Sequence, residues 1–310
     1  MSMTQSVLIC DQVNPVLNEI LEKNGLQITY EPEITPEEIL GKIENFEVVI
    51  VRSRTKITKD MIEKATKCQI IARVGVGLDN IDQTAAKEKN IRVINAVEGA
   101  MNAVAELVIG LMLSLAREIP RADREVRNGN WIKKELMGSE LRGKYLGIVG
   151  LGNIGKRLGR LARALNMNII GYDVVPIDEE FSSEVGLMKA DLGTLLASSD
   201  YVSLHVPLLD STKHLINAEK MSTMKNTSRI INTSRGGVID EEALYEFLKD
   251  GKLGGAALDV FEVEPATSNN LATLPNFIST PHMGAQTKEA QSLAANVIAE
   301  KIIQILRGVT

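Results

Sequence analysis

The sequence is poor in cysteine, histidine and aromatic residues. It contains two cysteines and three histidines, and aromatic residues make up 4% of its 310 positions. Cys10 and Cys68 lie outside any CxxC pair or Cys/His cluster, so we expect neither a disulfide framework nor a metal site. Both thiols are expected to be small buried apolar groups.

The sequence also lacks an excess of positive charge and a long apolar run. Its formal net charge of -5 gives no general attraction to nucleic acid or anionic lipid. The most apolar stretch, 107–116, is far shorter than the roughly 20 residues that span a bilayer, and it predicts a buried helix. No basic segment followed by an apolar core opens the chain, so we expect a cytoplasmic protein that binds neither nucleic acid nor membrane.

Short β-branched runs alternate with helical patterns along the chain. The first series is VLI, EVVIV, QIIA and IRVI, and the second is LGIVG, NIIGYD, YVSLHV, RIINT and AALDV. Helix-start signals stand between the runs, such as Thr35 followed by Pro36, and Thr58. Alternation of this kind predicts an α/β fold with two doubly wound parallel-sheet domains.

The two domains are expected to connect through long helices. The pattern over 101–117 is apolar on nearly every face, which predicts a helix buried on all sides, between domains or between subunits. The basic stretch that follows is expected to be irregular. The tail over 287–307 is one helical pattern with no strand after it, so it is expected to pack back on the first domain. We therefore expect a discontinuous first domain, 1–97 and 286–310, and a second domain, 98–285.

A glycine motif follows the first strand of the second series. Gly150, Gly152 and Gly155 have GxGxxG spacing between an apolar strand and a helix. These glycines permit a tight turn, close approach to a pyrophosphate and helix packing, with the diphosphate at the helix N-terminus. The next strand ends in Asp173, whose carboxylate would bind ribose hydroxyls and repel a 2′-phosphate. NAD is the expected cofactor, and the alternative is a glycine-tight turn without a ligand.

The three histidines differ in context. His214 lies in a polar stretch and is expected at the surface. His205 ends a strand, where a structural role and a place beside the cofactor are both compatible with the sequence. His282 lies in the rigid segment TPHMGAQT after a short strand. Imidazole titrates close to neutral pH, so His282 is the candidate general acid and base.

Two charged residues at other strand ends complete a set of reacting groups. Oxidation of a 2-hydroxy acid requires a base for the hydroxyl proton and a cation for the carboxylate. Glu264 would hold the imidazole of His282 by a hydrogen bond and favour its protonated form. Arg235 would bind the substrate carboxylate and carbonyl with its planar fork of donors.

The chain resembles the D-isomer-specific 2-hydroxyacid dehydrogenases over essentially its whole length. The matching segments are GLGNIG, NTSRGGVIDEEAL, LDVFEVEP and TPHMGAQT, in the expected order. The resemblance implies a Rossmann NAD-binding domain inserted in a flavodoxin-like substrate domain, a homodimer built around the helix from Met101, and catalytic roles for Arg235, Glu264 and His282. It also places along the NAD site Val76, Asn153, Ile154, Asp173, His205, Val206, Pro207, Thr233, Ser234, Asp259, Gly284 and Ala285. Asp259 is expected to meet the carboxamide of the nicotinamide, and Val76 stands where relatives often have threonine.

Within the family, VRSRTKIT, ARVGVGLDNID, WIKKELMGSEL and GAALDVFEVEP are most similar to the phosphoglycerate dehydrogenases. The expected substrate is therefore D-3-phosphoglycerate, whose phosphate needs further cations. The candidates are Arg52, Arg54, Lys56 and Arg73 in the first domain, and Lys133 and Lys134 of the same or the neighbouring subunit. The amides of Gly75 and Gly77 would cradle the carboxylate. The alternative for the cations is solvated surface charge.

Two other functions remain open. A glyoxylate or hydroxypyruvate reductase would share the fold, the cofactor and the three catalytic residues. Only the phosphate-binding cations distinguish a phosphoglycerate dehydrogenase from such a reductase. An NAD(H)-sensing corepressor-like protein would use the dinucleotide to promote assembly. Many phosphoglycerate dehydrogenases continue into a serine-binding regulatory domain. This sequence stops at Thr310, so we expect no serine feedback through such a domain.

Overall fold

The computed structural model describes residues 5–308, so the expectations about the first four residues and about Thr310 lie outside the described residues. The chain divides into two compact units, Met1–Met101 with Ala285–Thr310, and Asn102–Gly284. The expected boundaries, 97/98 and 285/286, fall within a few residues of this division.

The first unit contains one parallel five-stranded sheet in the order β2-β1-β3-β4-β5. Its strands are β1 (Ser6–Ile9), β2 (Gln27–Tyr30), β3 (Val48–Val51), β4 (Ile70–Arg73) and β5 (Arg92–Asn95). Its helices are α1 (Val16–Lys23), α2 (Pro36–Lys42), α3 (Lys59–Lys64), α4 (Gln83–Glu88) and α12 (Lys288–Leu306), with a 3₁₀ turn at Ile43–Asn45. This is the flavodoxin-like strand order.

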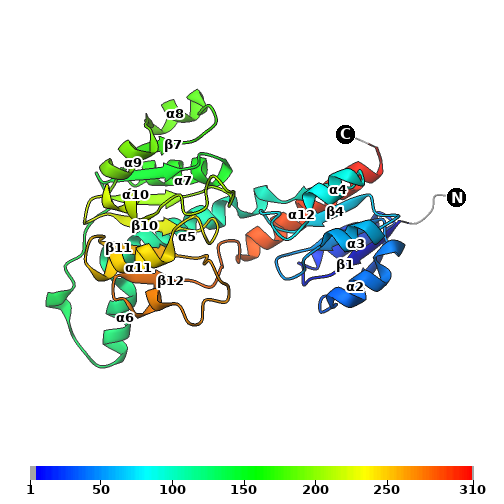
Figure 1. Ribbon diagram of the computed structural model, residues 1–310, viewed down its shortest axis with the longest axis horizontal. Helices are drawn as coiled ribbons and strands as arrows, with labels where there is room; N and C mark the ends of the chain where they lie inside the picture. The colour runs from blue at the N-terminus through cyan, green and yellow to red at the C-terminus, as the bar shows by residue number, and fades with distance from the viewer. Residues whose placement is uncertain (1–4, 309–310) are drawn as a thin grey trace. The chain divides into compact units, whose positions relative to one another are not determined.

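Two apolar clusters cover the two faces of this sheet. One packs α2, α3 and α4 around residues such as Ile39, Ile62 and Ala86, and the other packs α1 and α12 through Leu17 and Ile298 (Figure 1). The returning helix α12 therefore completes the core of the first unit, as the helical pattern of the tail suggests. Burial of these side chains is the main driving force for forming the unit.

Local signals determine where several helices begin. The side chain of Thr35 accepts a hydrogen bond from the backbone of Glu38, and Glu38 reciprocates, so α2 begins with a complete capping box. Thr58 stands before α3, but its side chain makes no cap hydrogen bond. Thr287 caps α12 through the amide of Ala290.

The second unit contains a parallel seven-stranded sheet in the order β12-β11-β10-β9-β6-β7-β8. Its strands are β6 (Tyr145–Val149), β7 (Asn168–Tyr172), β8 (Met188–Lys189), β9 (Tyr201–Leu204), β10 (Arg229–Asn232), β11 (Gly255–Leu258) and β12 (Phe277–Ser279). Its other elements are α6 (Ile119–Arg127), α7 (Asn153–Ala164), α8 (Glu179–Val185), α9 (Leu192–Ser198), α10 (Ala218–Ser222), α11 (Glu241–Lys249), and 3₁₀ turns at Lys133–Glu135 and Asn270–Thr273. The strand order reverses between β6 and β9, as in a Rossmann sheet, so the predicted fold class is confirmed.

The long apolar helix α5 (Val97–Arg117) differs from its prediction in length and burial. It has 21 residues and is long and apolar enough to cross a membrane by length and composition alone, although the apolar stretch in the sequence is shorter. Val108, Met112 and Ala116 are buried in the core of the second unit. Leu113 is 39% exposed, so a single chain does not bury the helix on all sides, and burial between subunits stays a prediction. The last four residues of helix α6, 124–127, lie at the start of the basic stretch 124–144, which was expected to be irregular.

Candidate active site

The glycine motif forms the turn between β6 and α7, and each glycine has its own surroundings. Gly150 has a φ of +91°, which glycine adopts without strain. A Cβ on Gly155 would lie 2.1 Å from the carbonyl oxygen of Gly150, whereas a Cβ on Gly152 would meet nothing within 4 Å. The turn therefore leaves open space at the glycine whose backbone is expected to approach a pyrophosphate, at the N-terminus of a helix.

His205 lies beside this turn, where the strand order reverses. A Cβ on Gly150 would lie 2.6 Å from the carbonyl oxygen of His205, so the two strand ends are in contact. The His205 ring is 2.9 Å from the hydroxyl of Ser203, and burial lowers its pKa to about 4. The imidazole of His205 is therefore neutral at pH 7 and is not a candidate general acid.

Two further side chains fit a dinucleotide. The carboxylate of Asp173 follows β7 and accepts hydrogen bonds from the amides of Leu151, at 2.6 Å, and Val175, at 3.2 Å. The hydroxyl of Thr233 is buried and has no hydrogen-bond partner among the described residues. A buried unpaired hydroxyl is costly, so this one is suited to a partner that arrives with a ligand.

Arg235, Glu264 and His282 follow the adjacent strands β10, β11 and β12. Because neighbouring parallel strands end at the same edge of a sheet, the three residues belong to one end of the second unit. The Nδ1 of His282 lies 2.8 Å from Oε2 of Glu264, and the amide of Phe261 donates to Oε1 of Glu264 at 3.1 Å. A carboxylate can only accept, so Nδ1 carries the proton and Nε2 is left to face a substrate. The His282 side chain is 48% exposed.

Asp259 is a buried carboxylate with three hydrogen bonds inside the second unit. Its side chain is 1% exposed, and Oδ1 accepts from the hydroxyl of Thr280, at 2.6 Å, and the amide of Met283, at 2.8 Å. Oδ2 accepts from the amide of Gly284 at 2.9 Å. The carboxylate thus ties β11 to the loop that carries His282, and its contact with a carboxamide stays a prediction.

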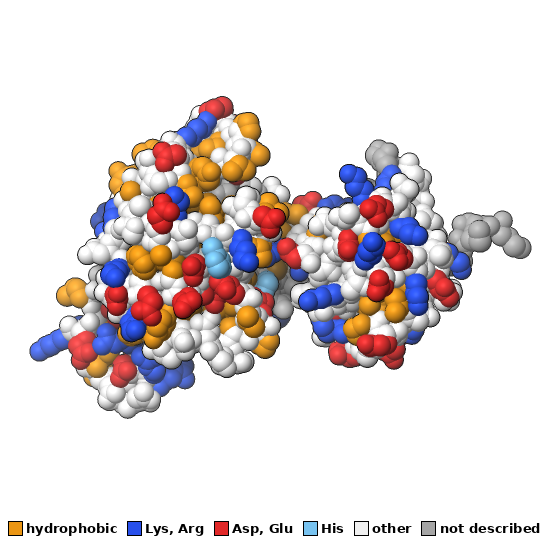
Figure 2. Space-filling view, in the orientation of Figure 1, with side chains coloured by type: hydrophobic (Ala, Val, Ile, Leu, Met, Phe, Trp, Pro, Cys, Tyr) orange, Lys and Arg blue, Asp and Glu red, His pale blue; other side chains and the backbone are white. Residues whose placement is uncertain are grey.

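Glu262, on the same loop as Glu264, forms a second histidine–glutamate pair with His214. Nε2 of His214 is 3.1 Å from Oε1 of Glu262, so the surface histidine of the sequence analysis has a partner. Glu262 also exchanges hydrogen bonds with Glu241 at the start of α11. Burial raises the pKa of Glu241, and the charges of Glu262 and Glu264 act in the same direction. Figure 2 shows acidic side chains gathered beside a histidine on this unit.

In the first unit, the guanidinium of Arg54 binds a carboxylate and backbone carbonyls of its own chain. Its Nε forms an ion pair with Asp11 at 3.0 Å, and its other nitrogens donate to the carbonyls of Cys10, Pro32 and Ile34. Asp11 is buried and also accepts from the hydroxyl of Thr55 at 2.7 Å. Arg54 therefore holds its loop in place, which weakens the prediction that it binds a phosphate.

Of the other predicted cations of the first unit, Arg52 and Lys56 make fewer hydrogen bonds and ion pairs with the protein than Arg54. Arg52 donates from its guanidinium to the carbonyl of Gln12 at 3.0 Å, and burial lowers its pKa. Arg73 donates to the carbonyls of Arg52 and Gly77, so its guanidinium lies over the RVGVG turn with Gly75. Lys56 is exposed. Arg52 and Lys56 are thus better candidates than Arg54 for an anion.

Lys133 and Lys134 form a short 3₁₀ turn in the second unit and are exposed. Large apolar side chains surround this segment in the sequence. Trp131 is 82% exposed and Met137 is 88% exposed. Two large apolar side chains are thus exposed in the single chain on either side of the two lysines.

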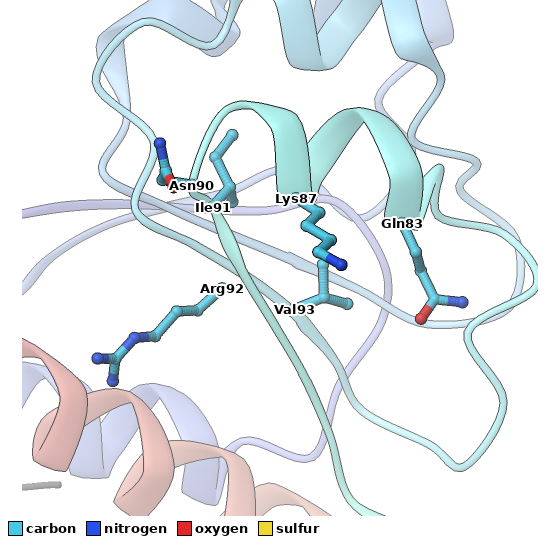
Figure 3. Close-up of a pocket in the computed structure, with 6 residues that line it drawn as sticks. All are labelled: Gln83, Lys87, Asn90, Ile91, Arg92 and Val93. Atoms are coloured by element: carbon cyan, nitrogen blue, oxygen red, sulfur yellow. The ribbon is translucent and has the colours of Figure 1, made fainter.

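A pocket in the first unit lies apart from the predicted residues. It has a volume of about 590 Å³ and is lined by Gln83, Lys87, Asn90, Ile91, Arg92 and Val93, along α4 and the edge strand β5 (Figure 3). The Arg92 side chain points to the opposite side of the strand from Val93 in Figure 3, so the two do not converge on one ligand. None of the predicted catalytic or binding residues lines this pocket.

Comparison with known proteins places the chain among dehydrogenases. Residues 109–284 match the family described as D-isomer specific 2-hydroxyacid dehydrogenase, NAD binding domain. The D-3-phosphoglycerate dehydrogenase of Methanocaldococcus jannaschii is 47% identical over 97% of this chain and 57% of its own length. The hydroxypyruvate reductase of Thermotoga maritima is 46% identical over 93% of both chains. The crystal structure of a glyoxylate reductase from Paecilomyes thermophila superposes with a TM-score of 0.90 at 29% identity, over 98% of this chain and 96% of that one.

The matches differ in how much of the relative they include. The chain spans little more than half the length of the archaeal and mammalian phosphoglycerate dehydrogenases that it matches, 57% in each case. It spans nearly all of the hydroxypyruvate reductase. The two groups of relatives therefore differ in their length and in the reaction that their names give.

Proposed function

The chain belongs to the D-isomer-specific 2-hydroxyacid dehydrogenases, and on this basis we propose that it oxidises D-3-phosphoglycerate to 3-phosphohydroxypyruvate with NAD, the first step of L-serine biosynthesis. The observation that supports the chemistry is the 2.8 Å contact between His282 Nδ1 and Glu264 Oε2. These two residues follow β12 and β11, and Arg235 follows the adjacent strand β10. The 41–47% identity to archaeal phosphoglycerate dehydrogenases supports the choice of substrate.

The proton moves through His282. Nε2 of His282 takes the proton of the substrate hydroxyl when the acid is oxidised and returns it when the keto acid is reduced. Glu264 holds Nδ1–H, which fixes the ring orientation and stabilises the imidazolium that forms. The bound NAD supplies the hydride acceptor.

Arg235 binds the carboxylate of the substrate. A guanidinium presents two parallel N–H donors to a carboxylate, which fixes both the position and the plane of the acid. The glycine turn, Asp173 and Thr233 hold the dinucleotide. We assign the phosphate of the substrate to Arg52 and Lys56, with Arg54 holding the loop between them.

We further propose that the protein acts as a homodimer in the cytoplasm. Exposed apolar side chains follow one another from α5 to the basic segment, namely Leu113, Ile119, Val126, Trp131 and Met137. Soluble monomers rarely expose so many large apolar groups on consecutive segments. A second copy of the chain would cover them, and Lys133 or Lys134 would then act in the neighbouring subunit.

Hydroxypyruvate reduction is the second candidate function. The relative with that name matches 93% of both chains, and the ion pair of Arg54 with Asp11 removes one cation from the phosphate site. Such a reductase would use the same His282, Glu264 and Arg235. The two functions therefore differ only in their need for cations in the first unit.

The test compares steady-state rates with 3-phosphoglycerate, hydroxypyruvate phosphate, hydroxypyruvate and glyoxylate, for the wild type and for Arg52→Ala and Lys56→Ala. Lys59→Ala is the matched control, because Lys59 is an exposed cation nearby that pairs with Glu63. A preference for phosphorylated acids that only the first two variants lose supports phosphoglycerate as the substrate. Equal or better rates with hydroxypyruvate, unchanged in all variants, establish the reductase. Absence of turnover with any of the four acids contradicts both.

A further inference from the structure

Asn232 is a buried polar residue that the sequence analysis did not select. It ends β10, and its side chain is 1% exposed. Its Oδ1 accepts hydrogen bonds from the amide of Ser234, at 3.0 Å, and from the hydroxyl of Ser234, at 2.7 Å. Its Nδ2 donates to the carbonyl oxygen of Arg235 at 2.8 Å. Both ends of one amide therefore bind the turn that presents Arg235.

The same turn is held from its other side by the loop that carries Glu264. A Cβ on Gly236 would lie 1.8 Å from the carbonyl oxygen of Phe261, so only glycine permits this approach of two backbones. The carbonyl oxygen of Asn232 accepts from the amide of Asp259 at 2.9 Å. The turn of Arg235 is thus fixed between the Asn232 side chain and the backbone of the neighbouring loop.

We propose that Asn232 is a positioning residue for Arg235. Its Nδ2 hydrogen bond to the Arg235 carbonyl sets the direction in which the guanidinium meets the carboxylate of a 2-keto or 2-hydroxy acid. The inference rests on the proposed function, in which Arg235 binds that carboxylate. Asn232 itself does not touch the substrate.

Orientation matters here because a guanidinium and a carboxylate bind best when they lie in one plane with two parallel hydrogen bonds. Without the Asn232 amide, the carbonyl of Arg235 and two groups of Ser234 lose their partners in a half-buried turn. The turn then has several conformations of similar energy, and in most of them the two planes do not match. A displacement of about 1 Å at a reacting group costs on the order of 100-fold in rate.

The experiment uses Asn232→Asp and Asn232→Ala. The aspartate retains the acceptor for Ser234 and the volume of asparagine, but it replaces the donor to Arg235 with an oxygen. Asn276→Ala is the matched control, because Asn276 also donates from its side chain to one backbone carbonyl of the same unit, that of Leu248 at 3.2 Å. The measurements are the melting temperature, the dissociation constant for NADH by fluorescence, the dissociation constant for oxamate in the presence of NADH, and KM and kcat for the preferred keto acid.

We expect both Asn232 variants to raise KM for the keto acid and the dissociation constant for oxamate by on the order of 10-fold or more, with a fall in kcat. The dissociation constant for NADH is expected to stay within about threefold, because the glycine turn and Asp173 are unchanged. Asn276→Ala should alter only the melting temperature. A role confined to folding would instead lower the melting temperature of all three variants and leave oxamate binding as in the wild type.

Three results would overturn the inference. The first is an Asn232→Asp variant with wild-type KM and oxamate affinity, and the second is an equal loss of NADH and oxamate affinity. The third is a wild type that neither turns over any keto acid nor binds oxamate, and this result overturns the proposed function as well. The first two, with an active wild type, leave the proposed function intact.

Discussion

Glu264 and His282 come from loops after neighbouring strands, and Nδ1 of His282 meets Oε2 of Glu264 at 2.8 Å. The other oxygen of Glu264 accepts from the amide of Phe261, which keeps the carboxylate in place when the imidazole moves. His282 has a φ of +51°, an uncommon conformation for a residue with a side chain. The loop therefore holds His282 in a strained backbone conformation, and such strain is common where a side chain has a function.

Removal of either partner should affect turnover more than cofactor binding. We expect His282→Ala to lower kcat by about 100-fold to 10,000-fold, since general acid–base catalysis contributes in this range. Glu264→Gln still offers an oxygen to Nδ1–H but carries no charge, so its kcat should fall less, by about 10-fold to 100-fold. Stopped-flow and steady-state rates measure both. Glu262→Gln, on the same loop and paired with His214, is the control, and a similar loss in that variant would contradict the assignment.

The glycine motif offers a pair of substitutions with opposite effects. In Gly155→Ala the new methyl group meets the Gly150 carbonyl oxygen, and overpacking of this kind costs about 1–3 kcal/mol of stability. In Gly152→Ala the methyl group meets no protein atom within 4 Å, so the melting temperature should stay near that of the wild type. NADH affinity should nevertheless fall by on the order of 10-fold, because the methyl group fills the space of the pyrophosphate. Full NADH affinity in Gly152→Ala would show that the dinucleotide does not lie there.

The charge of Asp173 should determine the choice between NAD and NADP. Asp173→Asn retains the shape of the side chain but removes the repulsion of a 2′-phosphate. We expect the ratio of kcat/KM for NAD to that for NADP to fall by on the order of 10-fold. Glu179→Gln, an exposed acid that pairs with Lys189, is the control for a general charge effect. An unchanged ratio in Asp173→Asn would mean that another group rejects the phosphate.

The stability of the protein should depend on His205 below neutral pH. Burial lowers the pKa of this imidazole from 6.5 to about 4. Above pH 6.5 the ring is neutral in the folded and the unfolded chain, and its stabilising contribution is complete. As the pH falls from 6.5 towards 4, the unfolded chain binds a proton that the folded chain does not, so the free energy of unfolding decreases. His205→Gln should flatten this part of the curve of melting temperature against pH, and curves that run parallel would contradict the pKa shift.

The sequence predicts the central strands well, but it misses two of the four edge strands. The runs VLI, EVVIV and QIIA correspond to β1, β3 and β4 to within a residue or so, because strands buried on both faces need continuous apolar side chains. The edge strands β2 and β8 escape prediction. β2 has the sequence QITY and β8 has only two residues, both exposed, so neither leaves an apolar run to detect.

Site residues are predictable where the chemistry itself restricts the residue type. A proton carrier, a carboxylate partner and a guanidinium at strand ends indicate a reaction without any coordinates. Asn232 could not be found in this way, because it acts on backbone atoms of its own turn. Arg54 shows another limit, since its charge predicts an anion site but the sequence does not reveal its ion pair with the distant residue Asp11. Long-range pairing of this kind leaves no local pattern.

The place of β12 in the sheet has a consequence for inactivation. β12 has three residues and lies at the edge of the sheet beside β11, so local opening can detach it more easily than the central strands. The loop of His282 directly follows β12. Three hydrogen bonds to the Asp259 carboxylate hold this loop to β11. Gentle heating or low denaturant should therefore abolish turnover while far-ultraviolet circular dichroism still reports an intact fold. Amides 277–284 should exchange with deuterium earlier than those of β6 and β9 at the centre of the same sheet.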